Sequence, residues 1–181
     1  MKKLLLITIM ALGVNTLYAQ KYMTRTGKIS FFSGTPIENI EAFNNEVASI
    51  LNAENGEFVF QLAIKSFKFE NALMQEHFNE SYMESDKYPK ALYKGTVSDI
   101  QNVNFDKDGK YEVHTVGKMT IHGVTKDVRV PATITVKGSE VTTEAKFNVA
   151  TEDYEIKIPG IAKNKIAKEI EVTVNSIHKK K

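Results

Sequence analysis

Apolar and polar residues alternate along most of the chain after about residue 21, which is the pattern of strands that bury one face. In a clear example, Phe58, Phe60 and Leu62 share one face, whereas Gln61 and Lys65 lie on the other. Runs of this kind predict eight strands, near residues 21–32, 46–52, 56–66, 91–105, 110–121, 124–137, 140–149 and 166–177.

Short turn motifs separate these runs. Asn55-Gly56, Asp108-Gly109, His122-Gly123 and Lys137-Gly138 each place a residue that tolerates positive φ between two alternating segments. Strands joined by tight turns pair antiparallel, and one-sided alternation over eight strands favours a sheet that closes on itself. We therefore expect an all-β fold, an eight-stranded antiparallel barrel with one or two short helices closing an end.

Two segments interrupt the alternation. Residues 70–84 have apolar residues at helical spacing, with Asn71 as the expected N-cap, and Tyr88-Pro89 requires an extended exit. Residues 153–165 form a long excursion that contains Pro159-Gly160. Both segments are candidate lids at a barrel mouth.

The interior of such a barrel is either filled by side chains or holds one small ligand, and periodicity leaves both open. Gly95 and Gly117 fall on the inward phase, where a filled core would prefer bulk, and Thr115 and Thr143 also point inward. These positions favour a cavity. The candidate ligand-binding residues are the large apolar side chains predicted to face inward or to lie on the helix: Phe31, Phe58, Phe60, Leu62, Met74, Phe78, Tyr93, Tyr111, Met119 and Phe147.

The N-terminus has the features of a secretory signal peptide. Lys2-Lys3 precede an apolar run over residues 4–14, and Leu17-Tyr18-Ala19 form a cleavage site before Gln20. The apolar run is shorter than the roughly 20 residues that a spanning helix needs. We therefore expect residues 1–19 to be cleaved, leaving one domain at residues 20–181 in the periplasm or outside the cell, without stable membrane insertion.

Charge and cysteine content then exclude several functions. The chain has 24 Lys and Arg against 22 Asp and Glu, and cleavage would remove two Lys and no acid, which leaves 22 of each. A neutral domain has no electrostatic case for nucleic acid or an anionic membrane surface. The absence of Cys excludes disulfides, thiolate catalysis and Cys-ligated metals.

Several short motifs occur beside the signal peptide: Gly27-Lys28-Ile29-Ser30-Phe31, Ser66-Phe67, Asn71-Ala72-Leu73-Met74, His77-Phe78, Tyr88-Pro89, GKMTIHGVTK at 117–126, Phe147-Asn148-Val149 and Asp153-Tyr154. In this order they resemble the YceI-like family of exported polyisoprenoid-binding proteins. The resemblance covers nearly the whole mature chain. It implies an elongated, lipocalin-like barrel that holds a long isoprenoid chain, without established catalytic residues, and it is compatible with a homodimer. This chain has shorter turns than the family and few polar groups to fix a ligand head.

Polar residues give little support to other chemistry. His114 and His122 are expected on the outward phase of one strand, about 26 Å apart, which is too far to share a metal. No nucleophile-elbow motif occurs, and we predict no catalytic residue, metal or cofactor. His77 is expected at the mouth, either packed there or touching a ligand head group.

We therefore expect an exported binding protein for a polyisoprenoid or other lipid. One alternative is an envelope stress or interaction protein that uses the barrel as a scaffold. Another is an enzyme on an isoprenoid-like substrate, with His77 and Glu76 as its candidate pair. Glu38, Glu41 and Glu46 are interpreted as a solvated, loop-like face.

Overall fold

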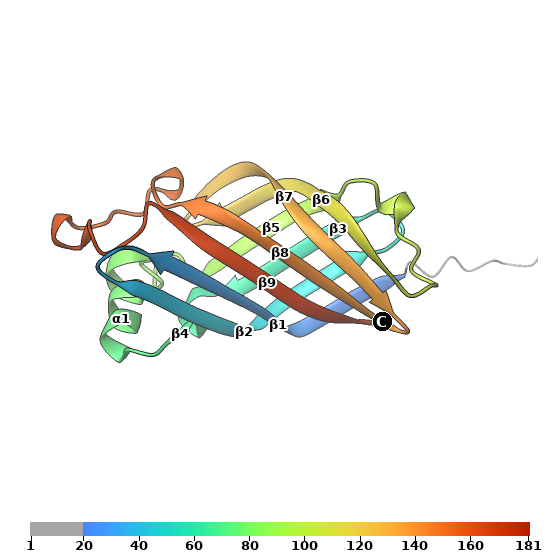
Figure 1. Cartoon of the computed structure of the whole chain (residues 1–181), viewed down its shortest axis with the longest axis horizontal. Helices are drawn as coiled ribbons and strands as arrows, with labels where there is room; N and C mark the ends of the chain where they lie inside the picture. The colour runs from blue at the N-terminus through green and yellow to red at the C-terminus, as the bar shows by residue number, and fades with distance from the viewer. Residues whose placement is uncertain (1–19) are drawn as a thin grey trace, which may run out of the picture.

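A computed structural model describes residues 20–181, and the predicted signal peptide lies outside this range. The chain forms an elongated β-barrel (Figure 1). Its strands are β1 (Lys21–Gly34), β2 (Asn39–Asn52), β3 (Glu57–Ala63), β4 (Lys68–Phe69), β5 (Lys90–Val97), β6 (Gly109–Ile121), β7 (Val124–Lys137), β8 (Glu140–Ala150) and β9 (Glu169–Lys180). Its helical segments are α1 (Ala72–His77), the π-helical turn η2 (Phe78–Tyr82) and the 3₁₀ turns η1 (Ile64–Ser66), η3 (Ile100–Asn102), η4 (Glu152–Tyr154) and η5 (Gly160–Ala162).

The sheet is antiparallel and closed. Its order is β1-β9-β8-β7-β6-β5-β3-β2, and pairing of β1 with β2 joins the two ends. The two-residue β4 only adds to β2 where β3 has turned away. Eight strands thus form the wall, which confirms the predicted eight-stranded barrel with a short helix.

The second strand is longer than the alternation predicts. β2 begins at Asn39, so Glu41 and Glu46 lie exposed on a strand and the loop-like interpretation of this segment is wrong. Up to Asn44 the buried residues are even-numbered, but from Val47 to Leu51 they are odd-numbered, because the register with β1 shifts between these positions. A bulge inserts an extra residue and breaks the period of two.

Two other strands are shorter than predicted. β3 ends at Ala63, where the chain enters a 3₁₀ turn. β5 ends at Val97 rather than at residue 105, because Asp99 adopts a left-handed conformation with φ of 59° and another 3₁₀ turn follows. Both deviations occur where the chain leaves the barrel wall.

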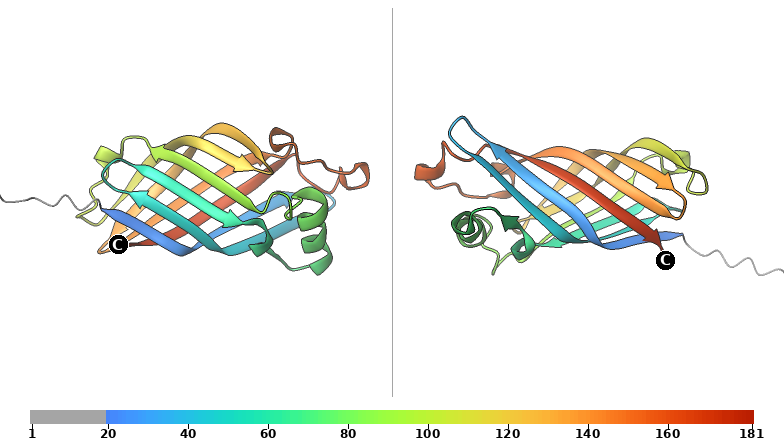
Figure 2. Two further views of the ribbon diagram at one scale, coloured as in Figure 1. Left: turned by 180° about the vertical axis from the view of Figure 1, so that it is seen from behind. Right: turned by 60° about the horizontal axis from the view of Figure 1, so that its bottom comes forward.

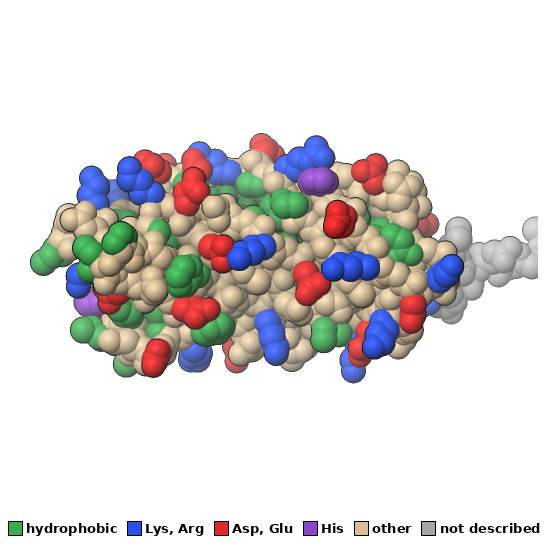
Figure 3. All heavy atoms as spheres, in the orientation of Figure 1, with side chains coloured by type: hydrophobic (Ala, Val, Ile, Leu, Met, Phe, Trp, Pro, Cys, Tyr) green, Lys and Arg blue, Asp and Glu red, His purple; other side chains and the backbone are tan. Residues whose placement is uncertain are grey.

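Both lid candidates lie at one end of the barrel, and the described termini lie at the other (Figures 1 and 2). The terminal end is filled by a plug cluster of buried side chains: Tyr22, Leu51, Val97, Ile100, Val103, Phe105, Val113, Ile134, Val136 and Val141. A second cluster, the mouth cluster, extends toward α1: Ala42, Val47, Phe60, Leu62, Ile64, Phe67, Met83, Tyr93, Met119, Val130, Tyr154 and Val174. On the outer face, acidic and basic side chains are interspersed (Figure 3).

Candidate ligand-binding cavity

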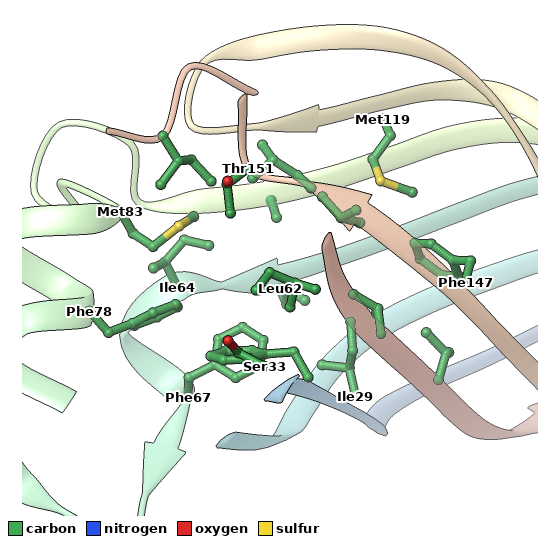
Figure 4. A pocket seen from close by; sticks show the side chains of 18 of the residues that line it. Ile29, Ser33, Leu62, Ile64, Phe67, Phe78, Met83, Met119, Phe147 and Thr151 are labelled. Atoms are coloured by element: carbon green, nitrogen blue, oxygen red, sulfur yellow. The ribbon is translucent and has the colours of Figure 1, made fainter. Parts of the chain in front are cut away.

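A cavity of about 780 Å³ lies inside the barrel, on the side of the mouth cluster (Figure 4). This volume falls within the roughly 300–1,000 Å³ typical of small-molecule sites. Most of its wall is aliphatic or aromatic, and it reaches from Leu51 and Ile134 of the plug cluster to Leu73 on α1 and Ile161 on η5. Because Leu73 is 57% and Ile161 94% exposed, the cavity opens at the end that carries α1.

Nine of the ten candidate residues predicted from the sequence lie on this wall: Phe31, Phe58, Phe60, Leu62, Met74, Phe78, Tyr93, Met119 and Phe147. The exception is Tyr111, which packs beside the plug cluster and donates a hydrogen bond to the Asn104 carbonyl at 3.4 Å. Tyr111 is inward in phase but lies beyond the inner end of the cavity. Contact between the other nine residues and a ligand stays a prediction.

The two inward glycines, Gly95 and Gly117, do not mark empty space in the barrel, contrary to the prediction. Gly95 and Gly117 are paired across β5 and β6, and a Cβ on Gly117 would overlap the Gly95 backbone. A Cβ on Gly95 would overlap the Tyr93 hydroxyl group, which lies over it. The glycines therefore allow close backbone approach and make room for the Tyr93 ring, instead of leaving empty space.

Four phenylalanines hold the helical segment on the barrel. The ring of Phe78, at the start of η2, is 5.4 Å from Phe31, 5.5 Å from Phe67 and 5.0 Å from Phe69, centroid to centroid. These distances are typical of favourable aromatic pairs. As predicted, Asn71 caps α1, since its side-chain oxygen accepts from the backbone N–H of Leu73 at 2.9 Å.

A buried histidine connects the two lid candidates. The His122 Nε2 atom lies 2.9 Å from Glu84 Oε2, just after η2, and its Nδ1 atom lies 3.1 Å from the Tyr154 carbonyl on η4. The expectation that His122 points outward is wrong: it is 8% exposed, because a φ of 51° in the β6–β7 turn redirects its side chain. His114, on the straight part of β6, is exposed as predicted.

The second buried histidine, His178, was not singled out by the sequence pattern. It lies outside the cavity wall, with Nδ1 3.1 Å from the Val141 carbonyl and Nε2 2.9 Å from the Ser49 hydroxyl. A carbonyl only accepts, so Nδ1 carries the proton and donates, while Nε2 accepts from Ser49. Burial lowers the pKa of His178, which keeps the imidazole neutral. His178 therefore has a structural role, since both of its ring nitrogens are hydrogen-bonded within the protein and it lies outside the cavity wall.

Three ionisable residues of the cavity wall lie at its mouth, and a fourth, Glu144, is exposed on β8. Lys165 and Glu38 face each other at the mouth, with Nζ and Oε2 3.7 Å apart, and His77 lies on α1. Within residues 20–181, no three His, Asp or Glu side chains gather to hold a metal ion. The same residues include no helix long and apolar enough to span a membrane.

Solved structures with the same fold include a polyisoprenoid binding domain from Saccharophagus degradans, with a TM-score of 0.77 and 11% identity over 89% of this chain and 98% of that chain. Burkholderia cenocepacia BcnA matches with a TM-score of 0.62 and 16% identity, over 84% and 95% of the two chains. A Campylobacter jejuni YceI protein matches with a TM-score of 0.61 and 14% identity, over 82% and 88%. At such low identity these similarities show the fold alone.

No curated protein matches the chain. The sequence profile of the YceI-like domain does match, over residues 14–176, which is nearly the whole chain. The profile match agrees with the closed eight-stranded barrel and with the short helix at its open end. The protein therefore belongs to the YceI-like domain family.

Proposed function

We propose that this protein binds a long apolar ligand, a polyisoprenoid or another lipid, along the axis of its barrel, and that it acts by binding without turnover. The observation that carries the proposal is the apolar cavity of about 780 Å³ that opens at one end. The similar Saccharophagus degradans structure is itself described as a polyisoprenoid binding domain, which supports the same ligand class.

Burial of the ligand's hydrocarbon would supply the affinity. Each buried CH₂ group contributes about 0.8 kcal/mol, so a long chain could bind tightly without a hydrogen bond. Ordering of the chain and loss of its translational freedom offset part of this gain. A solid scaffold barrel would offer no such interior.

Access would lie between the two lid segments. α1 and η2 supply Met74 and Phe78 to the wall, and the loop before β9 supplies Ile158 and Ile161. Exposed apolar side chains at this rim would let a lipid pass from a membrane or a carrier into the barrel without full exposure to water. A lipid would then enter the barrel between these two segments.

We also propose that the protein is exported and acts in the periplasm or outside the cell, with the signal peptide cleaved before Gln20. Support comes from the charge and apolar pattern of residues 1–19. The mass of the secreted or periplasmic protein tests this proposal, because cleavage removes a defined segment. Protein that keeps Met1 would contradict it.

Native mass spectrometry of the mature protein, followed by solvent extraction, tests the binding function. The expected result is a stoichiometric long-chain prenyl or acyl molecule that is released by extraction. An apo protein that takes up no added prenyl lipid would contradict the proposal and favour the scaffold role.

A charge on the cavity wall provides a matched pair of variants. Met119→Asp places a carboxylate in the cavity, where an isolated charge is strongly disfavoured, and should abolish ligand retention. Val116→Asp, on the same strand but 48% exposed, is the control and should retain the ligand. Equal retention by two folded variants would refute the axial site.

A further inference from the structure

Two buried hydroxyl groups on the cavity wall have no hydrogen-bond partner among residues 20–181. They belong to Tyr93 on β5 and Thr143 on β8, each 7% exposed and each part of the wall. A buried hydroxyl without a partner is costly, and each such group in a native protein therefore requires an explanation. Both groups therefore indicate where a bound molecule would complete the hydrogen bonding.

These hydroxyls lie at the inner end of the cavity. The Tyr93 side chain leans over Gly95, toward the plug cluster, in the space that the glycine leaves free. Thr143 is paired with Ile134, a plug-cluster residue. A third buried hydroxyl, on Thr115, is also part of the wall, and Thr115 pairs with Val97 of the plug cluster. Hydroxyl groups from three strands thus belong to the wall at the inner end of the apolar cavity.

The hydroxyl groups at the inner end are uncharged. Burial raises the pKa of the Tyr93 phenol, so Tyr93 stays protonated and can donate a hydrogen bond. Of the charged wall residues, Lys165, Glu38 and His77 lie at the mouth. Glu144 is exposed on the outer face, where it accepts from Asn175 at 3.2 Å.

This arrangement selects between classes of ligand head. A diphosphate at the inner end would be buried without a cation, which is strongly unfavourable. The oxygen of a hydroxyl, phenol or carbonyl group would instead accept a hydrogen bond from the Tyr93 or the Thr143 hydroxyl. Neutral heads therefore fit the inner end, and charged heads fit only the mouth beside Lys165.

We propose that the inner end of the cavity binds the neutral, oxygen-bearing head of an amphiphile, with its hydrocarbon chain directed toward the mouth. This inference rests on the proposed function and adds the head class and the orientation. Tyr93 and Thr143 fix the head, and the mouth cluster surrounds the chain.

The test compares geranylgeraniol with the hydrocarbon of the same chain that lacks the hydroxyl, by displacement of a fluorescent apolar probe. The variants are Tyr93→Phe and Thr143→Val, which keep shape and remove the hydroxyl. Tyr22→Phe is the control, because Tyr22 is also buried but lies in the plug cluster, away from the cavity wall. We expect each cavity variant to weaken the alcohol roughly tenfold relative to the hydrocarbon, and the control to change neither.

Geranylgeranyl diphosphate provides a second comparison, since its charged head should stay at the mouth and be unaffected by Tyr93→Phe. The inference is overturned if Tyr93→Phe weakens the alcohol and the hydrocarbon equally, or weakens neither. In those cases binding itself survives and the proposed function stands. If wild-type protein binds none of the three compounds, the proposed function fails together with the inference.

Discussion

Replacement of Phe78 by alanine should loosen the lid while leaving the barrel intact. Phe78 joins the α1–η2 segment to the barrel through the rings of Phe31, Phe67 and Phe69. The segment is short, with six α-helical and five π-helical residues, and could not be stable without this packing.

The size of the effect follows from the contacts. Truncation of a fully buried Phe costs about 3–5 kcal/mol, and each aromatic pair contributes about 0.5–1.5 kcal/mol. Phe78 is only partly buried, so we expect a loss of about 2–3 kcal/mol, confined to opening of the segment. This loss corresponds to roughly 30- to 150-fold faster hydrogen exchange at the segment's protected amides.

Hydrogen exchange measures this loosening directly. The reporters are the N–H groups of Met83 and Ser85, which donate to the carbonyls of Phe78 and Asn79 at 2.9 and 2.8 Å. These amides should exchange faster in Phe78→Ala, while amides in the middle of β7 keep their wild-type rates. Leu73→Ala is the control, since Leu73 is 57% exposed and its truncation should change little.

Two results would contradict the prediction that Phe78 holds the α1–η2 segment on the barrel. If the reporters exchange at wild-type rates, Phe78 does not hold the segment. If β7 accelerates as much as the reporters, the segment is part of the global folding unit and cannot open alone.

Two further predictions concern the buried histidines. Because burial lowers the pKa of folded His178, the unfolded state binds a proton first as the pH falls, so its contribution to stability is complete above about pH 6.5 and is lost toward lower pH. In urea unfolding, the free energy of unfolding of the wild-type protein should fall by up to about 1.4 kcal/mol per pH unit in that window. This fall should be absent in His178→Asn and present in His114→Asn. Identical slopes in the two variants would contradict the prediction. Replacement of His122 by alanine removes its contacts with Glu84 and the Tyr154 carbonyl and should cost about 1–3 kcal/mol, or roughly 2–12 °C in Tm by calorimetry. An unchanged Tm would show that the loops do not depend on His122.

Much of the barrel could be predicted because a strand with one buried face has a strict period of two. β6 and β7 lie within one residue of their predicted bounds, since tight turns end them and no bulge disturbs them. The first part of β2, before residue 46, escaped prediction because the bulge shifts the buried residues from even to odd positions, and because Asn44 is polar yet fully buried. A single-sequence pattern carries no signal for that shift.

The cavity wall was predictable to the same extent as the strands, because inward phase and large apolar side chains coincide there. Phase does not give depth along the barrel: Tyr111 and Tyr93 share the inward phase, but Tyr93 lies on the cavity wall and Tyr111 lies beside the plug cluster. The outcomes for His122 and Gly95 depend on a turn conformation and a cross-strand contact, which arise only in three dimensions.

The methionines of the described chain allow the most direct test of the axial site. Met74, Met83 and Met119 lie on the cavity wall, at the lid and along the barrel, whereas Met23 on β1 does not. In protein labelled with ¹³C at the Met methyl groups, addition of geranylgeraniol should shift the NMR signals of these three residues and leave Met23 unchanged. A bound ligand that leaves the three cavity signals in place, or that shifts Met23 alone, would contradict binding inside the barrel.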